Sequence, residues 1–194
     1  MISTKEDLRE YIRADAKACG RASVKAGLFG DEIWKFTVTL RKLEYYTNQK
    51  GYFRYITLPL RLFHKLQLHN RGLRLGFSIP VKAFGKGLAI VHYGTIVVAH
   101  NARIGENCRI HEGVTIGATN GSDQAAVIGN NVFLASGAKI IGAITIADDV
   151  TIAANAVVTS SIYEKGTTWG GVPARKISDN DSHSNLNPAL FADI

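Results

Sequence analysis

Two stretches in the second half of the chain decide its fold: IGENCRIHEGVTIG at residues 104–117 and IGNNVFLASGAKIIGAITIADDVTIAANAVV at residues 128–158. An α-helix would repeat its apolar residues every 3.6 positions and a strand every two. Here the period is six, which predicts short strands that are each followed by a turn. The aliphatic residues in this register are Ile104, Ile110, Ile116, Ile128, Leu134, Ile140, Ile146, Ile152 and Val158.

Three such strands close one coil of about 18 residues, and coils stacked at the ~4.8 Å spacing of paired strands would share one core. Each aliphatic side chain should then lie over the one that follows three repeats later. The predicted pairs are Ile110 with Ile128, Ile128 with Ile146, and Ile116 with Leu134. The repeat therefore predicts a parallel β-helix that begins near Pro80.

The repeat is interrupted once. Midway between Ile116 and Ile128 the register position holds Ser122, which is not aliphatic, and Asn120-Gly121 is a strong turn signal. We expect residues 119–127 to leave the coil as a loop, and loops on a rigid solenoid often carry specificity.

The pattern divides the chain into three parts. Residues 1–76 are predicted to form a helical N-terminal domain, in which Thr4 and Asp7 fit a capping box at the first helix. Residues 77–177 form the β-helix. Residues 178–194 are polar, and we expect them to be a flexible tail.

The net charge of +7 is unevenly distributed. Residues 1–78 carry 15 Lys and Arg against 7 Asp and Glu, whereas residues 79–194 carry 8 against 9. A basic N-terminal surface suits nucleic acid, an anionic membrane or an acidic glycan, and a plain solvated helix face explains it equally well. The basic, amphipathic segment 52–75 is a candidate for peripheral membrane contact, although packing against the coil or neighbouring subunits is the interpretation we favour.

No apolar signal stretch follows Met1, and no run approaches the ~18 apolar residues of a membrane span. Cys19 and Cys108 are too few to indicate a disulfide framework. We therefore expect a cytoplasmic protein.

Four motifs carry a family resemblance: HYGTIV at 92–97, GVTIG at 113–117, GAKIIG at 137–142 and GVPAR at 171–175. In this order and spacing they resemble the serine acetyltransferase branch of the hexapeptide-repeat acyltransferases. The resemblance implies an all-β, left-handed parallel β-helix of hexapeptide repeats with a short α-helical N-terminal domain. It also implies a homotrimer or a dimer of trimers, with acetyl-CoA bound between neighbouring subunits.

The resemblance assigns the role of general base to His92, which occupies a register position that elsewhere holds an aliphatic residue. A hydroxyl must lose its proton as it attacks the thioester carbonyl, and an imidazole with a pKa of about 6.5 can accept that proton at neutral pH. Backbone N–H groups at a coil corner could stabilise the oxyanion.

The resemblance also implies positions for acetyl-CoA. Small residues spaced one coil apart should stack on one edge and let the pantetheine arm lie against the backbone, and basic residues near the end of the β-helix should meet the phosphates. The predicted cofactor residues are Ala118, Ser136, Ala154, Gly171, Arg175 and Lys176.

Three departures from the serine enzymes bear on the acceptor. Val91 and Phe77 stand where the family has acidic residues, and the extruded loop reads Asp123-Gln124-Ala125-Ala126, without the family's arginine. Arginine is the natural bidentate partner of a substrate carboxylate. We therefore expect a sugar hydroxyl of a surface polysaccharide or its precursor as the acceptor.

Asp123, His111 and Glu112 are candidates for binding the acceptor or orienting His92. His111 follows His92 by one coil plus one position, so the two should be neighbours on successive coils.

Two alternatives remain open: a serine O-acetyltransferase of cysteine biosynthesis, and a non-enzymatic β-helix scaffold or binding module. A metal version would need His92, His111 and His100 together, but positions 92 and 100 fall on different sides of the coil. We expect no metal and no nucleic acid partner.

Overall fold

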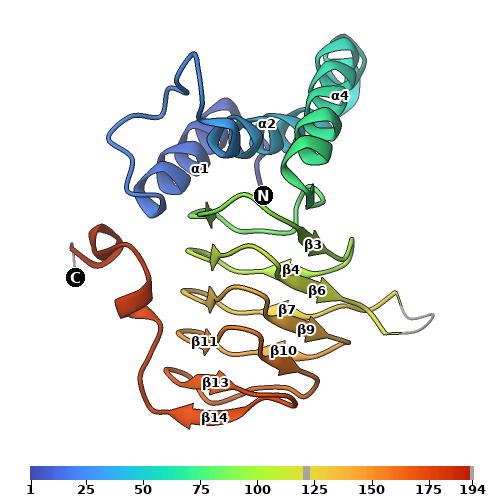
Figure 1. Ribbon diagram of the computed structural model, residues 1–194. Helices are drawn as coiled ribbons and strands as arrows, with labels where there is room; N and C mark the ends of the chain where they lie inside the picture. Colours follow the sequence, from blue (N-terminus) through green and yellow to red (C-terminus); the bar gives the residue numbers. More distant parts are fainter. Residues whose placement is uncertain (120–122, 193–194) are drawn as a thin grey trace.

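The computed structural model describes residues 1–119 and 123–192. A layer of helices covers one end of a column of stacked coils, and the C-terminal segment runs back along the side of the column (Figure 1). The helices are α1 (Lys5–Ala18), α2 (Glu32–Thr47), α3 (Gly51–Ile56) and α4 (Leu58–Leu75). In the described part of the chain, no helix is long and apolar enough to cross a membrane.

Local signals set the ends of the helices. At α1 the Thr4 hydroxyl accepts a hydrogen bond from the Asp7 backbone N–H at 3.0 Å, and the Asp7 carboxylate accepts one from the Thr4 N–H at 2.8 Å. This is the predicted capping box, and it satisfies two amide groups that the helix itself cannot. At the other end of the layer, α4 stops at Gly76, whose φ of 79° suits glycine.

The column is built from short strands in three sheets, and among the described residues every strand pair is parallel except β13 with β14. The sheets have the orders β1-β3-β6-β9-β12, β10-β7-β4 and β14-β13-β11-β8-β5-β2. The bounds are β1 Phe77–Ser78, β2 Ala89–Ile90, β3 Ile96–Val98, β4 Arg103–Ile104, β5 Arg109–Ile110, β6 Thr115–Gly117, β7 Val127–Ile128, β8 Phe133–Leu134, β9 Lys139–Ile141, β10 Thr145–Ile146, β11 Thr151–Ile152, β12 Val157–Val158, β13 Thr168–Gly170 and β14 Arg175–Ser178. A parallel β-helix is therefore confirmed.

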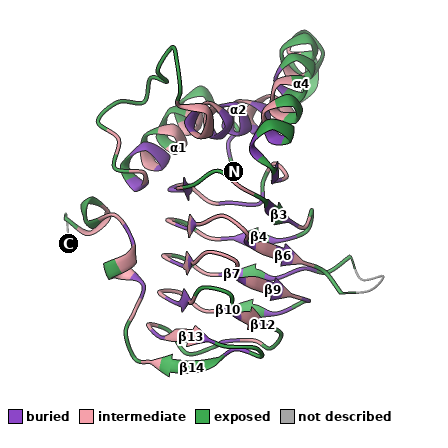
Figure 2. Cartoon of the chain, viewed as in Figure 1, coloured by how far each residue is buried: buried purple, intermediate pink, exposed green. Residues whose placement is uncertain are grey.

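The aliphatic residues at every sixth position form the core of the column (Figure 2). All nine that define the register are at most 4% exposed. This agrees with the physical reason for the repeat, because no coil could bury these side chains without its neighbours.

The predicted stacking of these residues is wrong at the interrupted coil. Ile110 pairs with Leu134, and Ile116 pairs with Ile140, so these partners are four repeats apart and not three. The reason is the loop between β6 and β7, which takes one repeat of the sequence out of the coil; its residues 120–122 lie outside the described residues. Below the loop the expected spacing returns, and Ile128 pairs with Ile146.

At one corner of the column, side-chain hydrogen bonds link residues of three successive coils. Asn107, Asn131 and Asp149 all have φ between 53° and 61°, a conformation that asparagine and aspartate tolerate. The Asn107 side-chain amide donates to Asn131 Oδ1 and the Asn131 amide donates to Asp149 Oδ1, each at 2.9 Å. The same residues thus make the sharp turn and link successive coils.

A buried ion pair joins the helical layer to the first coil. Arg41 of α2 and Asp15 of α1 are 1% and 0% exposed, and Arg41 Nε lies 2.7 Å from Asp15 Oδ2. Arg41 also donates to the carbonyls of Phe84 and Gly85, while Asp15 accepts the backbone N–H groups of Gly87 and Leu88. The two side chains therefore fix the loop that leads into β2.

The last segment differs from the flexible tail expected from its polar composition. It contains two short 3₁₀ helices, His183–Asn185 and Pro188–Phe191, and it buries Ser182 and Leu186. Hydrogen bonds to the column hold the segment in place: the Asn185 carbonyl accepts one from Arg109 at 3.0 Å, and the His183 ring lies 2.9 Å from the Asp149 carboxylate. The division into domains at residues 76 and 177 stays a prediction.

Candidate active site

His92 lies at the corner between β2 and β3, and its side chain is exposed. The turn needs Gly94, whose φ is 131°, and a Cβ atom there would lie 3.0 Å from the Cβ of Glu112 on the next coil. The pairing of Ile90 with Ile110 places Glu112, two residues further on, directly over the position of His92. We call the stacked turns after β2, β5, β8 and β11 the His92 corner.

The structure brings together three of the predicted site residues at this corner. The rings of His92 and His111 are 5.2 Å apart and nearly perpendicular. One nitrogen of each histidine and one oxygen of Glu112 lie within 4.8 Å of one another. The spacing of one coil plus one position therefore predicted the contact between the two histidines, although Glu112 is the residue in line with His92.

Ser136 joins the same cluster from the coil below. Its hydroxyl lies 3.4 Å from His111 Nδ1, and its hydrogen bond to Glu112 is the main cause that lowers the pKa of the Glu112 carboxyl. Burial, reinforced by the charges of Arg109 and His92, lowers the pKa of His111. Glu112 is thus held ionised and His111 neutral, side by side in the sequence.

Two atoms of the cluster lack a partner among the described residues: His111 Nε2 and Glu112 Oε2 are both buried without a hydrogen bond. Buried polar atoms are normally paired, so unpaired ones indicate water or a ligand. The two histidines and Glu112 are also the kind of residues that bind a divalent cation. His100, which the metal alternative would need, lies at the next corner, between β3 and β4.

The predicted cofactor residues do not all share one edge. Leu134 pairs with Ile152, so Ser136 lies over Ala154 at the His92 corner. Ala118 follows β6 and lies at a different corner, where the extruded loop begins. The predicted stack of Ala118 on Ser136 is wrong, because it counted the loop as part of the coil.

The remaining predicted residues lie apart from the cluster. Asp123 is in the extruded loop, where its carbonyl accepts a hydrogen bond from Asn101 at 2.6 Å. Gly171 and Arg175 are exposed around the β13–β14 turn. Lys176 is paired with Glu164 and Asp179, each at 2.5 Å, so a phosphate would have to compete with two carboxylates.

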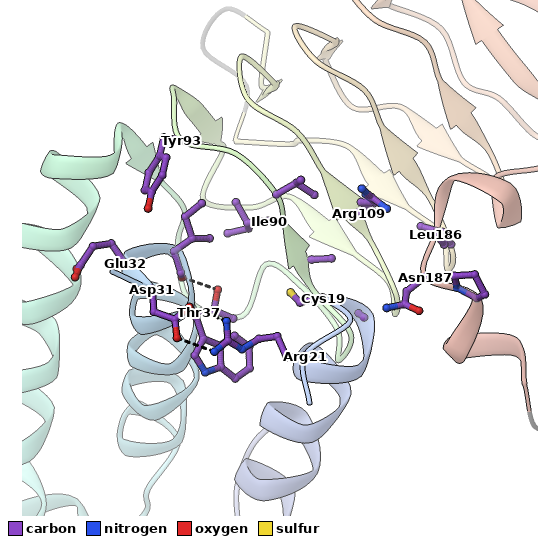
Figure 3. Close-up of a pocket in the computed structure, with 16 residues that line it drawn as sticks. Cys19, Arg21, Asp31, Glu32, Thr37, Ile90, Tyr93, Arg109, Leu186 and Asn187 are labelled. Carbon is purple, nitrogen blue, oxygen red and sulfur yellow. Dashed lines mark hydrogen bonds and ion pairs between the residues drawn. The ribbon is translucent and has the colours of Figure 1, made fainter. Parts of the chain in front are cut away.

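The sequence did not predict a cavity of about 560 Å³ beside the His92 corner (Figure 3). Its lining includes Val91 and Tyr93, which flank His92, and the Arg21–Asp31 ion pair. The cavity lies between α1, α2, β2 and the C-terminal segment, and residues so far apart in sequence give no local signal. Asp31 lies just before α2.

Because the Arg21–Asp31 ion pair lines this cavity, we expect acid to destabilise the fold there. Hydrogen bonds from Arg21, at 2.7 Å, and from the Gly27 N–H lower the pKa of Asp31 from 3.8 to about 2. Because the folded pKa is the lower one, the pair stabilises the fold above pH 4 and this stabilisation is lost as the pH falls toward 2.

We therefore expect urea unfolding measured between pH 5 and pH 2.5 to show a smaller loss of stability in Asp31→Asn than in the wild type. Arg21→Gln should reduce the loss in the same way, since it removes the other half of the pair. Identical pH dependence in all three proteins would contradict the assignment.

Comparison with known proteins agrees with this architecture. The family model described as bacterial transferase hexapeptide (six repeats) matches residues 125–160. The serine acetyltransferase of Staphylococcus xylosus is 32% identical over 151 residues, which cover 73% of this chain. The chain spans 64% of the length of that relative.

Solved structures share the fold. The crystal structure of serine acetyltransferase from Brucella abortus strain S19 superposes with a TM-score of 0.71 at 24% identity, covering 92% of this chain and 72% of the other. The complex of a Brucella abortus serine acetyltransferase with coenzyme A gives a TM-score of 0.64 at 26% identity, covering 89% and 67%. These neighbours imply a helical N-terminal domain followed by a left-handed β-helix.

The repeat, the coiled sheets and the family match define a hexapeptide-repeat protein of the bacterial transferase type. Within that superfamily the chain belongs to the serine acetyltransferase-like branch of the acyltransferases, as its motifs predicted.

Proposed function

We propose that this protein transfers the acetyl group of acetyl-CoA directly to an acceptor hydroxyl, with His92 as the general base. The observation that carries the proposal is the His92 corner. There an exposed imidazole lies beside an ionised carboxylate and a neutral second imidazole, on a fold shared with serine acetyltransferases.

The chemistry needs one base and no covalent enzyme intermediate. His92 accepts the proton of the acceptor hydroxyl while the oxygen attacks the thioester carbonyl. The tetrahedral intermediate collapses, the C–S bond breaks, and the CoA thiolate leaves and takes up the proton from the imidazolium. The products are an acetyl ester and CoA.

Glu112 supplies the carboxylate partner that Val91 and Phe77 do not. It lies on the coil next to His92, and its charge stabilises the imidazolium that forms when His92 accepts a proton. His111, kept neutral, can donate or accept a hydrogen bond at the acceptor without competing for that charge.

The two corners that carry the small cofactor residues support an oligomeric site. Ser136 and Ala154 lie at the His92 corner, and Ala118 lies at the corner of the extruded loop. One acetyl-CoA can touch both sets in a groove where the corner of one subunit meets the other corner of its neighbour. A cyclic trimer provides three such grooves.

L-Serine is the first candidate acceptor, because the relatives and the structural neighbours are named as serine acetyltransferases. The sugar acceptor expected from the sequence has no support among them. It stays the second candidate on one specific observation: the loop residues 123–126 contain no arginine, and Val91 and Phe77 replace acids.

A thiol-release assay tests the proposal. Acetyl-CoA is mixed with the protein and either L-serine or one of a panel of free and nucleotide-linked sugars, and free CoA is measured. We expect release with L-serine above the hydrolysis background. Release only with sugars would replace the first acceptor by the second, and no release with any hydroxyl compound would refute acetyl transfer.

A further inference from the structure

Much of α4 is exposed (Figure 2), and both α3 and α4 carry large apolar side chains among their exposed residues. None of the six residues of α3 is buried. The exposed fractions are 77% for Tyr52, 66% for Phe53, 73% for Tyr55, 55% for Leu62, 54% for Phe63 and 61% for Leu66. We call these residues the α3–α4 face. Single exposed apolar residues are common on proteins, but six large ones on two successive helices indicate a binding surface.

The arrangement on α4 is regular. Leu58, Leu62 and Leu66 follow one another at every fourth position, so they form one stripe along the helix. The buried residues of α4 are His64, Gly72 and Leu75, and none of them belongs to this stripe. The exposed leucines therefore do not contribute to the hydrophobic core.

The charged side chains on α3 and α4 themselves all have the same sign. Residues 45–105 contain no Asp or Glu, while residues 45–78 contain six Lys and Arg. Lys50, Arg54, Arg61 and Lys65 form no ion pair with any residue that the structure describes. If a second copy of the same face docked here, these cations would oppose one another, and like charges across an interface are strongly unfavourable.

An anionic lipid surface satisfies both features of the face. Leucine and aromatic side chains can enter the boundary between headgroups and acyl chains, while Lys and Arg remain at the anionic headgroups. Neither helix could span the bilayer, so this mode of binding is the one left for them at a membrane.

The position of the face also suits a flat partner. The helical layer covers one end of the column, and α4 extends away from the coils (Figure 1). In the proposed trimer, coils that run side by side would present three such faces at the same end. Three weak contacts to one surface bind far more tightly than one.

We propose that the α3–α4 face binds the surface of an anionic lipid bilayer and holds the protein at the membrane without spanning it. This inference goes beyond acetyl transfer, and it can fail while acetyl transfer is correct. Membrane contact through this segment was the less favoured interpretation of the sequence; the exposure of both helices reverses that order.

Co-sedimentation of the full chain with vesicles tests the proposal. The vesicles contain phosphatidylcholine alone or an equal mixture with phosphatidylglycerol, at low and at high salt. We expect binding to the anionic vesicles only, and weakening of that binding by salt. The variant Arg54→Gln/Arg61→Gln should bind at least tenfold less, because each cation near the surface contributes a several-fold increase in affinity.

A second variant, Leu62→Gln/Leu66→Gln, should also lose binding, whereas the matched control Ile177→Gln changes an equally exposed residue on β14 and should not. Absence of binding to anionic vesicles, or equal binding to neutral ones, would overturn the proposal. So would leucine variants that break up an oligomer in sedimentation velocity while vesicle binding is unchanged, because the face would then be a subunit interface.

Discussion

We expect His92→Ala to lower kcat/KM for acetyl transfer by about 10²- to 10⁴-fold, the usual contribution of a positioned general base. The acceptor hydroxyl would have to attack the thioester while still protonated or with water as the base. Because the side chain is exposed and outside the core, its removal should leave folding intact. Thiol release with saturating acetyl-CoA measures the effect.

Two controls separate this result from a general loss of function. His69→Ala changes an exposed histidine on α4, away from the His92 corner, and should retain wild-type rates. Binding of acetyl-CoA to His92→Ala, followed by calorimetry, should be nearly unchanged, since the base acts on the acceptor. An unaltered kcat/KM in His92→Ala would remove His92 from the mechanism.

The extruded loop marks the limit of what the repeat could predict. The period of six identified each buried aliphatic residue, because the requirement for an inward side chain is local to each strand. The stacking partners depend on how many residues the loop takes out of the coil. The sequence repeat alone does not give that number. The same miscount placed Ala118 on the same edge as Ser136.

The candidate site, too, could be predicted from the sequence only in part. His92 and His111 could be related from the sequence, because no extruded loop lies between their coils. The alignment of Glu112 with His92 depends on the register of β2 with β5, where Ala89 pairs with Arg109 because this first full coil is slightly longer than three regular repeats. Arg21 and Asp31 could not be paired, since no periodic pattern links a helix end to a loop.

The buried pair of Asp15 and Arg41 is a further feature without a local signal, as the two residues are 26 positions apart on different helices. We expect Arg41→Ala to reduce the free energy of unfolding by about 3–5 kcal/mol, the range for breaking a buried ion pair. The variant leaves Asp15 charged and buried, and it leaves the carbonyls of Phe84 and Gly85 without their donor. Guanidinium unfolding at fixed protein concentration measures the loss.

The exposed pair of Arg9 and Glu6 is the matched control. Its side chains are 65% and 69% exposed, so Arg9→Ala should cost less than about 1 kcal/mol. Arg41→Lys tests the geometry, because lysine keeps the charge but cannot reach Asp15 and two carbonyls at once; it should recover only part of the stability. Since Asp15 also holds the N–H groups of Gly87 and Leu88, just before β2, loosening this pair should lower acetyl transfer as well. Equal costs for Arg41→Ala and Arg9→Ala would show that the pair does not anchor the helical layer to the coil that carries His92.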